Sequence, residues 1–334
     1  MSECLKLDLN EMPYCPPENV IKAAQRGSMH LNRYAEDDAL QRLAALLAEY
    51  AGVGSDQIVI GPGSDLLLRE IVLCFGVRRK VVMVSPTFLP TVRVAGHFAR
   101  KLVSIRLDRP DFNLPREALL EELKEPCLVI IDNPNNPTGK LLVDREFVEE
   151  ILEQPDTLLV VDEAYFEFSG LTFVEKIASH ANLALARTMD KAFGLAGARI
   201  GYLIAGRAFL GAFCAAFSFL PQPSLEAAIE ALLHQSYMWK NVQQVVYERE
   251  RLSGELEMQG ETVFPSSTNF LLLRSLIPSP VEELRQRGVL VMDVSNQLGP
   301  GFIRVNLGTP DENDAFLRTY RTIRKPTQEQ ETSS

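Results

Sequence analysis

The chain has 334 residues, of which 46% are hydrophobic and 23% charged, so it can bury the core of one large domain with a smaller one beside it. Its formal net charge of -10 argues against a nucleic-acid partner, because nucleic-acid-binding surfaces collect Lys and Arg. The five scattered cysteines, four histidines without zinc spacing and a polar N-terminus favour a cytoplasmic protein with reduced thiols, no metal site and no secretory signal.

The longest apolar stretch, residues 208–221, is short for a membrane span, which needs about 20 residues. It is expected to form a buried helix or a subunit contact, so no membrane partner is expected.

The predicted elements change character along the chain. The first thirty or so residues are rich in Pro, lack periodicity and are expected to pack on the small domain or on another subunit. From residue 35 to 220, β-branched and leucine-rich runs alternate with amphipathic stretches: QIVIG, DLLLREIVLCFG, KVVMVSP, LVIIDN, TLLVVDEAY and LALART. This alternation predicts an α/β fold with a mostly parallel sheet that is covered on both faces.

After Pro223 a long helical pattern, residues 224–260, leads into FPSSTNFLLLRSL, VEELRQRGVLVMDV and GFIRVNLGTPDENDAFLRTYRTI. These segments predict a smaller α+β domain. The predicted division is an arm of residues 1–32, a large domain of residues 33–222, a small domain of residues 223–325 and a disordered tail of residues 326–334.

Polar residues that follow the predicted strands are the first candidates for a site, because ligands of open α/β sheets bind beyond the carboxyl ends of the strands. In GPGSDLLLREIV, residues 61–72, glycines precede a helix that should begin near Ser64. This is either a phosphate seat or an ordinary turn. In LVIIDNPNNPTGK, residues 128–140, three asparagines offer neutral donors in a tight loop, which is equally compatible with a structural turn.

Two further strand ends carry charged residues. Asp162 follows an apolar run in TLLVVDEAYFEF and either caps the next turn or holds a cation there, and Tyr165 offers a phenol to the same place. Lys191 follows LALART, and Arg199 lies eight residues further on. A desolvated lysine is a Schiff-base nucleophile, and arginine suits a phosphate.

Together these features match one cofactor, pyridoxal 5′-phosphate, which needs a phosphate seat, a lysine, a carboxylate for its ring nitrogen and donors for its phenolic oxygen. A remote alternative is a non-catalytic nucleotide-binding α/β protein. It is disfavoured because neither GxGxxG nor GxxxxGK[ST] occurs in a strand-turn-helix context.

At this point the chain resembles the fold-type I aminotransferases of class I/II, and most closely the histidinol-phosphate aminotransferase family. The resemblance runs along nearly the whole chain. It is carried by LNEMPY, NRYAEDDALQRLAALLAEYAGV, GPGSD, SPTF, NPNNPTG, VVDEAYFEF, RTMDKAFGLAGARIGY, STNFLLL and FIRVNLGTPDEN.

The resemblance implies a catalytic set at the cofactor ring. Lys191 would form the Schiff base and move a proton between Cα and C4′, and Asp162 would pair with the pyridinium nitrogen. Asn136 and Tyr165 would hydrogen-bond the ring oxygen O3′. Other contacts of the cofactor would come from Phe88 on the ring face and from Gly63, Ser64, Asp65, Thr188 and Arg199 at the phosphate.

The resemblance also implies a substrate site and a homodimer. Arg304 would bind the substrate carboxylate, with Tyr14 and Asn136 lining the same pocket. Tyr34 would reach the phosphate in the neighbouring subunit.

Three residues depart from the family pattern. Asp190 replaces the usual serine before the lysine, Leu66 stands where glutamate is common, and Met292 stands where histidinol-phosphate aminotransferases carry an arginine for the substrate phosphate. We expect Asp190 to turn away from the phosphate or to find a cation of its own, leaving Thr188 and Arg199 to hold the anion. The change at Met292 counts against histidinol phosphate.

The predicted function is amino transfer between an L-amino acid, or an amine like histidinol phosphate, and a 2-oxo acid. An apolar or aromatic amino-acid side chain is the working hypothesis. The alternative is a decarboxylase resembling threonine-phosphate decarboxylase, or a cyclase or lyase that uses the same cofactor.

Overall fold

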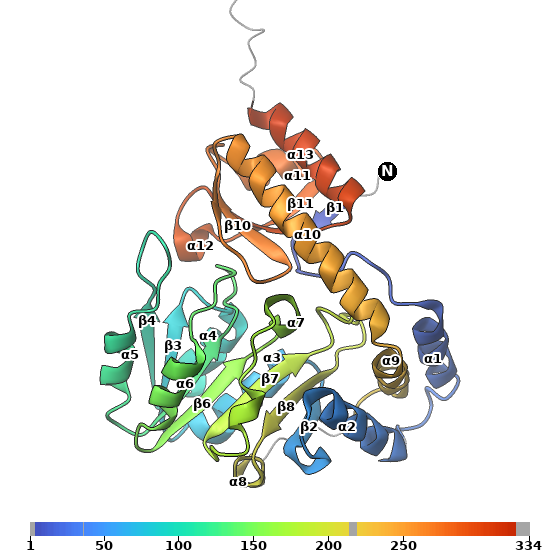
Figure 1. The fold of residues 1–334 in the computed structure, drawn as a ribbon, viewed down its shortest axis with the longest axis vertical. Coiled ribbons are helices and arrows are strands. Elements are labelled where there is room, and N and C mark those ends of the chain that lie inside the picture. The colour runs from blue at the N-terminus through green and yellow to red at the C-terminus, as the bar shows by residue number, and fades with distance from the viewer. Residues whose placement is uncertain (1–3, 36, 214–218, 325–334) are drawn as a thin grey trace, which may run out of the picture.

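The fold contains two β-sheets, a larger one in the lower part of Figure 1 and a smaller one above it. The computed structural model describes residues 4–35, 37–213 and 219–324. The predicted tail at residues 326–334 and part of the apolar stretch 208–221 lie outside these ranges.

The larger sheet has seven strands and is mostly parallel, which confirms the predicted α/β class. In spatial order the strands are β2 (Ile58–Gly61), β8 (Gly201–Ala205), β7 (Leu183–Thr188), β6 (Thr157–Asp162), β5 (Cys127–Asp132), β3 (Lys80–Ser85) and β4 (Lys101–Arg106). Strand β8 runs antiparallel to both of its neighbours, whereas the pairs from β7 to β4 are parallel. Strands β4 and β8 were not among the predicted strands.

Helices cover both faces of this sheet. Alternate residues of each strand face opposite sides, and apolar residues on both sides need a helix to pack against. Val81 and Met83 belong to one apolar cluster with α3 (Ser64–Ile71), α4 (Leu89–Phe98) and α8 (Arg207–Ala212). Val82 and Val84 belong to the other cluster. The helices of that cluster include α2 (Asp37–Ala51), α5 (Arg116–Glu122), α6 (Arg145–Leu152) and α7 (Phe166–Ser169).

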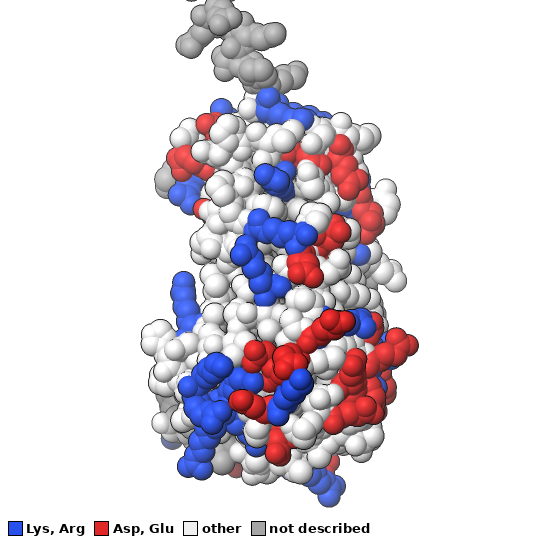
Figure 2. Space-filling view, turned by 90° about the vertical axis from the view of Figure 1, so that its left-hand side faces the viewer, with Lys and Arg blue, Asp and Glu red and all other residues white. Residues whose placement is uncertain are grey.

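The edge strand β4 carries exposed basic residues, including Lys101 and Arg106. On the side of the molecule that includes this edge, Lys and Arg side chains gather in the half that holds the larger sheet, with acidic side chains beside them (Figure 2). Charged side chains on an edge strand discourage pairing with another chain.

The smaller sheet is mixed and has five strands. In spatial order they are β1 (Leu5–Leu7), β11 (Val289–Asp293), β12 (Phe302–Asn306), β10 (Phe270–Arg274) and β9 (Thr262–Phe264). Strand β1 is parallel to β11, and the remaining pairs are antiparallel. The helices of this part are α10 (Ser236–Met258), α11 (Pro280–Gln286), α12 (Ser295–Leu298) and α13 (Pro310–Arg324).

The predicted long helical pattern after residue 222 is two helices, not one. Helix α9 (Gln222–Leu233) packs against α1 (Glu18–Ser28) and α2, whereas α10 begins beside α9, contacts α7 and runs up to the smaller sheet (Figure 1). The break falls at His234 and Gln235, without Gly or Pro, so the different packing partners of the two halves account for it. The domain division at residue 222 stays a prediction.

The N-terminal segment contains a helix that was not predicted, because no periodicity was recognised in its sequence. Helix α1 packs on α9, while β1 joins the smaller sheet. Residues 8–17 connect these two elements. No helix in the described part of the chain is both long enough and apolar enough to cross a bilayer.

Candidate active site

A cavity of ≈ 410 Å³ lies between the two sheets, at the carboxyl ends of β5, β6 and β7. Most of the predicted site residues line it. They are Ser64, Asp65, Phe88, Asn136, Asp162, Tyr165, Thr188, Lys191, Arg199 and Arg304. Gly63, Tyr14 and Tyr34 do not line it.

The loop after β7 brings a lysine and an arginine into this cavity. The Met189 N–H donates to the Ile200 carbonyl at 2.8 Å, and the Leu195 N–H donates to the Met189 carbonyl at 3.1 Å. Arg199 has a φ of 56°, in the left-handed region that few side chains adopt. The compact loop therefore returns the chain to β8 and puts Lys191 and Arg199 on one cavity wall.

Lys191 has the properties of a nucleophilic amine. Its Nζ donates to the Leu9 carbonyl at 3.3 Å. Burial, and next the positive charge of Arg304, lower the pKa of Lys191 to about 8. A substantial neutral fraction is therefore available near pH 8, which is the form that attacks a carbonyl carbon.

Asp162 ends β6 in a buried position. Its Oδ1 accepts from the Ala164 N–H at 3.1 Å, and no Lys or Arg in the described ranges forms an ion pair with it. Burial, and next the charge of Asp132, raise the pKa of Asp162 to about 7. A carboxyl in this environment favours a partner that brings a positive charge or a proton.

Asp132 is a cavity residue that the sequence analysis missed. It ends β5 and pairs in register with Asp162 on the neighbouring strand. Its carboxylate accepts from Thr87 Oγ1 at 2.7 Å, from Asn135 Nδ2 at 2.9 Å and from the Asn136 N–H at 2.8 Å. These bonds hold the NPNNPTG loop, and the position of Asp132 at a strand end, like that of Asp162, was the signal available in the sequence.

Asn10 is a second missed residue. Its Nδ2 donates to the Tyr165 hydroxyl at 2.9 Å, and its backbone φ of 55° is left-handed. Asn269 Nδ2 donates to the Asn10 carbonyl at 3.0 Å, so both ends of Asn10 are held. Burial raises the pKa of Tyr165 to about 12, so the phenol keeps its proton and can donate it.

Arg304 projects from β12 beside the asparagine loop. It donates from Nη1 to Asn136 Oδ1 at 2.6 Å and from Nη2 to the Asp8 carbonyl at 2.7 Å. Its Nε is buried and has no hydrogen-bond partner in the described chain. Burial lowers the pKa of Arg304, and its cross-strand neighbour is Met292.

The start of α3 forms a close-packed backbone corner. Gly63 precedes the helix with a φ of 89°, and Gly201 of β8 lies against it. A Cβ on Gly201 would lie 2.3 Å from both Gly63 C and Ser64 N, so only glycine fits there. The Ser64 N–H and hydroxyl at this helix start, with Thr188 and Arg199 nearby on the cavity wall, make an anion-binding corner.

One of the two expectations for Asp190, that it turns away from this corner, is wrong. Its carboxylate pairs with Arg199 Nη1, while Asp65 pairs with Nη2 of the same guanidinium. The second expectation, a cation for Asp190, is met, but the cation is Arg199 itself. Arg199 is therefore not free to bind an anion by itself, because the compact loop turns the side chains of both Asp190 and Arg199 into the cavity.

Tyr34 and Tyr14 lie away from the cavity wall. The Tyr34 side chain is 76% exposed and stacks on Phe219, which is 61% exposed, with ring centroids 4.2 Å apart. The Tyr14 hydroxyl is buried and has no hydrogen-bond partner among the residues described.

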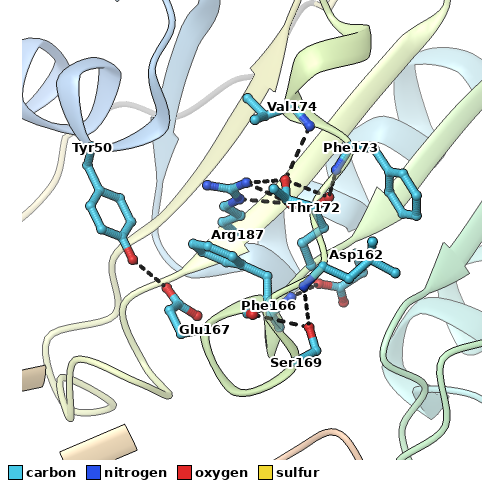
Figure 3. Close-up of polar contacts among 12 residues, drawn as sticks. Tyr50, Asp162, Phe166, Glu167, Ser169, Thr172, Phe173, Val174 and Arg187 are labelled. Carbon is cyan, nitrogen blue, oxygen red and sulfur yellow. Dashed lines mark hydrogen bonds and ion pairs between the residues drawn. The ribbon is translucent and has the colours of Figure 1, made fainter. Parts of the chain in front are cut away.

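A buried polar network supports the strand ends behind the cavity. Arg187 Nε donates to Glu163 Oε2 at 2.9 Å, and Thr172 Oγ1 bonds both side chains. Figure 3 shows Arg187 and Thr172 at the centre of this network, with Tyr50 reaching Glu167 from α2 at 3.2 Å. Glu163 and Arg187 each adjoin a cavity residue in sequence, so their ion pair fixes the ends of β6 and β7.

Comparison with known proteins gives one consistent family. The model of the aminotransferases of class I and II matches residues 2–319. The histidinol-phosphate aminotransferase of Thermococcus gammatolerans is 37% identical over 324 residues, covering 96% of this chain and 92% of that protein. Histidinol-phosphate aminotransferase 1 of Archaeoglobus fulgidus is 35% identical, covering 96% of this chain and 99% of that protein.

Solved structures agree with this result. The histidinol-phosphate aminotransferase of Sinorhizobium meliloti, in complex with pyridoxal-5′-phosphate, has a TM-score of 0.84 and 28% identity, covering 95% of this chain and 91% of that chain. The L-threonine-O-3-phosphate decarboxylase of Porphyromonas gingivalis has a TM-score of 0.78 at 23% identity, covering 95% of this chain and 98% of that chain, a likeness of fold.

Proposed function

The chain belongs to the aminotransferases of class I and II and is a pyridoxal 5′-phosphate-dependent enzyme of the histidinol-phosphate aminotransferase type, and we propose that its amino donor is an L-amino acid with an apolar or aromatic side chain. The acceptor in this proposal is a 2-oxo acid. The names of the relatives point to histidinol phosphate, so the choice of donor depends on this chain's own substrate pocket.

The cavity chemistry fits the cofactor. Asp162 is a buried carboxyl that no Lys or Arg of the described ranges pairs with, which suits a protonated ring nitrogen, and the glycine corner at Ser64 suits a phosphate. We assign Lys191 to the cofactor aldehyde, Asn136 and Tyr165 to its ring oxygen and Phe88 to its ring face. The proposed phosphate contacts are Gly63, Ser64, Asp65, Thr188 and Arg199.

Bound pyridoxal 5′-phosphate supplies an aldehyde for the amino group and a ring that accepts electrons from the substrate Cα. Lys191 Nζ, of which a substantial fraction is neutral near pH 8, would take the proton from Cα and deliver it to the cofactor's C4′. Asp162 would keep the proton on the ring nitrogen, and the Tyr165 hydroxyl would donate to the ring oxygen.

The proposal on the donor is supported by one observation, the pairing of Met292 with Arg304 across β11 and β12. An arginine at position 292 would place two guanidinium groups on neighbouring strands, which suits a phosphate dianion. Methionine leaves one, which suits a carboxylate, and adds apolar surface. Leu9, Leu89 and Val294 line the same cavity and extend that surface.

A screen of amino donors against 2-oxoglutarate tests this assignment. We expect aromatic and aliphatic L-amino acids to be used in preference to histidinol phosphate. Selective use of histidinol phosphate would contradict the proposal. Conversion of the bound cofactor to its pyridoxamine form identifies amino transfer, whereas release of carbon dioxide without that conversion would identify a decarboxylase.

The variant Met292→Arg sharpens the same test. It should raise kcat/KM for histidinol phosphate relative to phenylalanine by at least about tenfold, the effect of one charge-assisted contact of about 1.5–3 kcal/mol. Met258→Arg, which adds the same charge at an exposed position of α10, is the matched control and should change nothing.

The cofactor lysine has its own test. The protein with bound cofactor should absorb in the visible range, and Lys191→Ala should abolish that band. A band that persists in Lys191→Ala would exclude the assigned lysine.

We further propose that the enzyme is a cytoplasmic homodimer in which Tyr34 reaches the partner's cofactor phosphate. The support is the exposed stack of Tyr34 on Phe219, together with the exposed apolar residues Met29 and Leu31 shortly before Tyr34 in the chain, because exposed apolar surface marks protein contacts. Sedimentation equilibrium should give a dimer. The variant Tyr34→Phe should weaken cofactor binding but leave the dimer intact. A monomer with full cofactor affinity would refute both parts.

A further inference from the structure

The guanidinium of Arg199 is held between two carboxylates on the cavity wall. Asp190 binds Nη1 and Asp65 binds Nη2. The Asp190 side chain is only 8% exposed, and its second oxygen, Oδ1, is buried without a hydrogen-bond partner in the described chain. Arg199 holds the carboxylate itself, and the Asp190 N–H fixes the attached backbone by donating to the Thr188 hydroxyl at 3.1 Å.

The charges at this corner do not favour a third anion. One guanidinium faces two carboxylates, and a phosphate monoester brings about 1.5–2 further negative charges at neutral pH. The cofactor phosphate and the Asp190 carboxylate therefore compete for the same Nη1 donor. Arg199 cannot satisfy both with its preferred paired geometry while Asp65 occupies Nη2.

Asp190 differs from Asp65 in its surroundings. The side chain of Asp65 is 40% exposed and can turn to solvent, whereas that of Asp190 is enclosed. When an anion enters, Asp65 can leave at little cost, but a displaced Asp190 carboxylate stays near the phosphate and repels it. Asp190 is therefore the residue that weakens anion binding here.

We propose that Asp190 is an internal competitor for the cofactor phosphate, and that it makes the pyridoxamine form of the cofactor readily dissociable. The inference rests on the proposed position of the phosphate at Ser64 and Arg199. It adds to the proposed function a role for Asp190. The pyridoxamine form has no covalent link to Lys191, so its retention depends largely on the phosphate contacts. A competing carboxylate has its largest effect on this form.

The test is the equilibrium binding of pyridoxamine 5′-phosphate to the cofactor-free, full-length protein, followed by fluorescence. Asp190→Asn removes the charge at constant shape, and Asp190→Ser removes charge and bulk. Both variants should bind the ligand at least tenfold more tightly than the wild type, which is about 1.4 kcal/mol. Near-ultraviolet circular dichroism checks that each variant is folded.

Two controls make the result specific. Pyridoxamine without its phosphate should bind the wild type and Asp190→Asn with equal affinity. Asp293→Asn, which neutralises a carboxylate of the same cavity on β11, should leave the affinity for pyridoxamine 5′-phosphate unchanged.

Three outcomes would overturn the proposal. Unchanged or weaker binding by both Asp190 variants would show that the carboxylate does not compete, and equal tightening for pyridoxamine would show that its effect is not on the phosphate. Arg199→Gln separates this inference from the site assignment. If Arg199→Gln weakens binding while the Asp190 variants do not tighten it, only the inference fails; if Arg199→Gln has no effect, the phosphate position and the inference fail together.

Discussion

The buried carboxyl of Asp162 makes a quantitative prediction about stability. Burial raises its pKa from the usual 3.8 to about 7 in the folded protein. A raised pKa means that the folded state holds the proton more tightly than the unfolded state. Its contribution to stability is therefore present at low pH and is lost as the pH rises through about 4 to 7.

The magnitude follows from the size of the shift. One pKa unit corresponds to about 1.36 kcal/mol, so between pH 5 and pH 8 this group should lower the free energy of unfolding of the cofactor-free protein by roughly 2.5 kcal/mol. In Asp162→Asn the side chain keeps its shape but cannot ionise. The free energy of unfolding of the variant, minus that of the wild type, should therefore be larger at pH 8 than at pH 5 by that amount.

The assay is urea unfolding of the cofactor-free wild type and of Asp162→Asn at pH 5 and pH 8. Glu150→Gln, at an exposed position of α6, is the control and should follow the wild type at both pH values. Asp132 also has its pKa raised by burial, to about 6, and adds a trend of the same sign to both proteins. A wild-type-to-variant difference that is equal at the two pH values would refute the reasoning.

Three further changes probe the surroundings of the site. Asn10→Ala removes the donor to Tyr165, worth about 1 kcal/mol, so kcat should fall roughly fivefold with little change in KM; an unchanged kcat in steady-state assays would mean that Asn10 does not orient the phenol. Arg187→Ala leaves Glu163 buried and unpaired and should lower the free energy of urea unfolding by about 3–5 kcal/mol, part of which a second change, Glu163→Gln, should restore; no recovery in the double variant would contradict the ion-pair explanation. Gly201→Ala puts a methyl group into the backbone before α3 and should weaken pyridoxamine 5′-phosphate binding by about 1–3 kcal/mol in a fluorescence titration, whereas wild-type affinity would show that the corner can relax.

The sequence predicted the α/β class and most of the cavity because both depend on local signals. Asp162 and Lys191 follow apolar strands, and the carboxyl ends of neighbouring strands meet at one edge of the sheet. Asn10 had no such signal. It reaches Tyr165 only because the segment after β1 crosses the cavity, which is a property of the whole fold.

The orientation of Asp190 was outside the reach of local rules. Alternation of neighbouring side chains holds for extended strands, and Asp190 lies beyond the end of β7 in a compact loop. The left-handed Arg199 closes that loop and turns its guanidinium back onto Asp190. Such a pairing depends on backbone angles that residue type alone does not specify.

The pairing of β1 with β11 also bears on how the enzyme is made. Residues 5–7 are synthesised long before their partner strand, residues 289–291. The strands of the proposed phosphate corner, β2, β7 and β8, are complete by residue 205, so that corner can assemble on the nascent chain well before the proposed substrate pocket. Strand β1 stays unpaired until β11 has been synthesised, and a long-range parallel pair of this kind forms slowly. During biosynthesis the proposed cofactor site can thus form before the proposed substrate site.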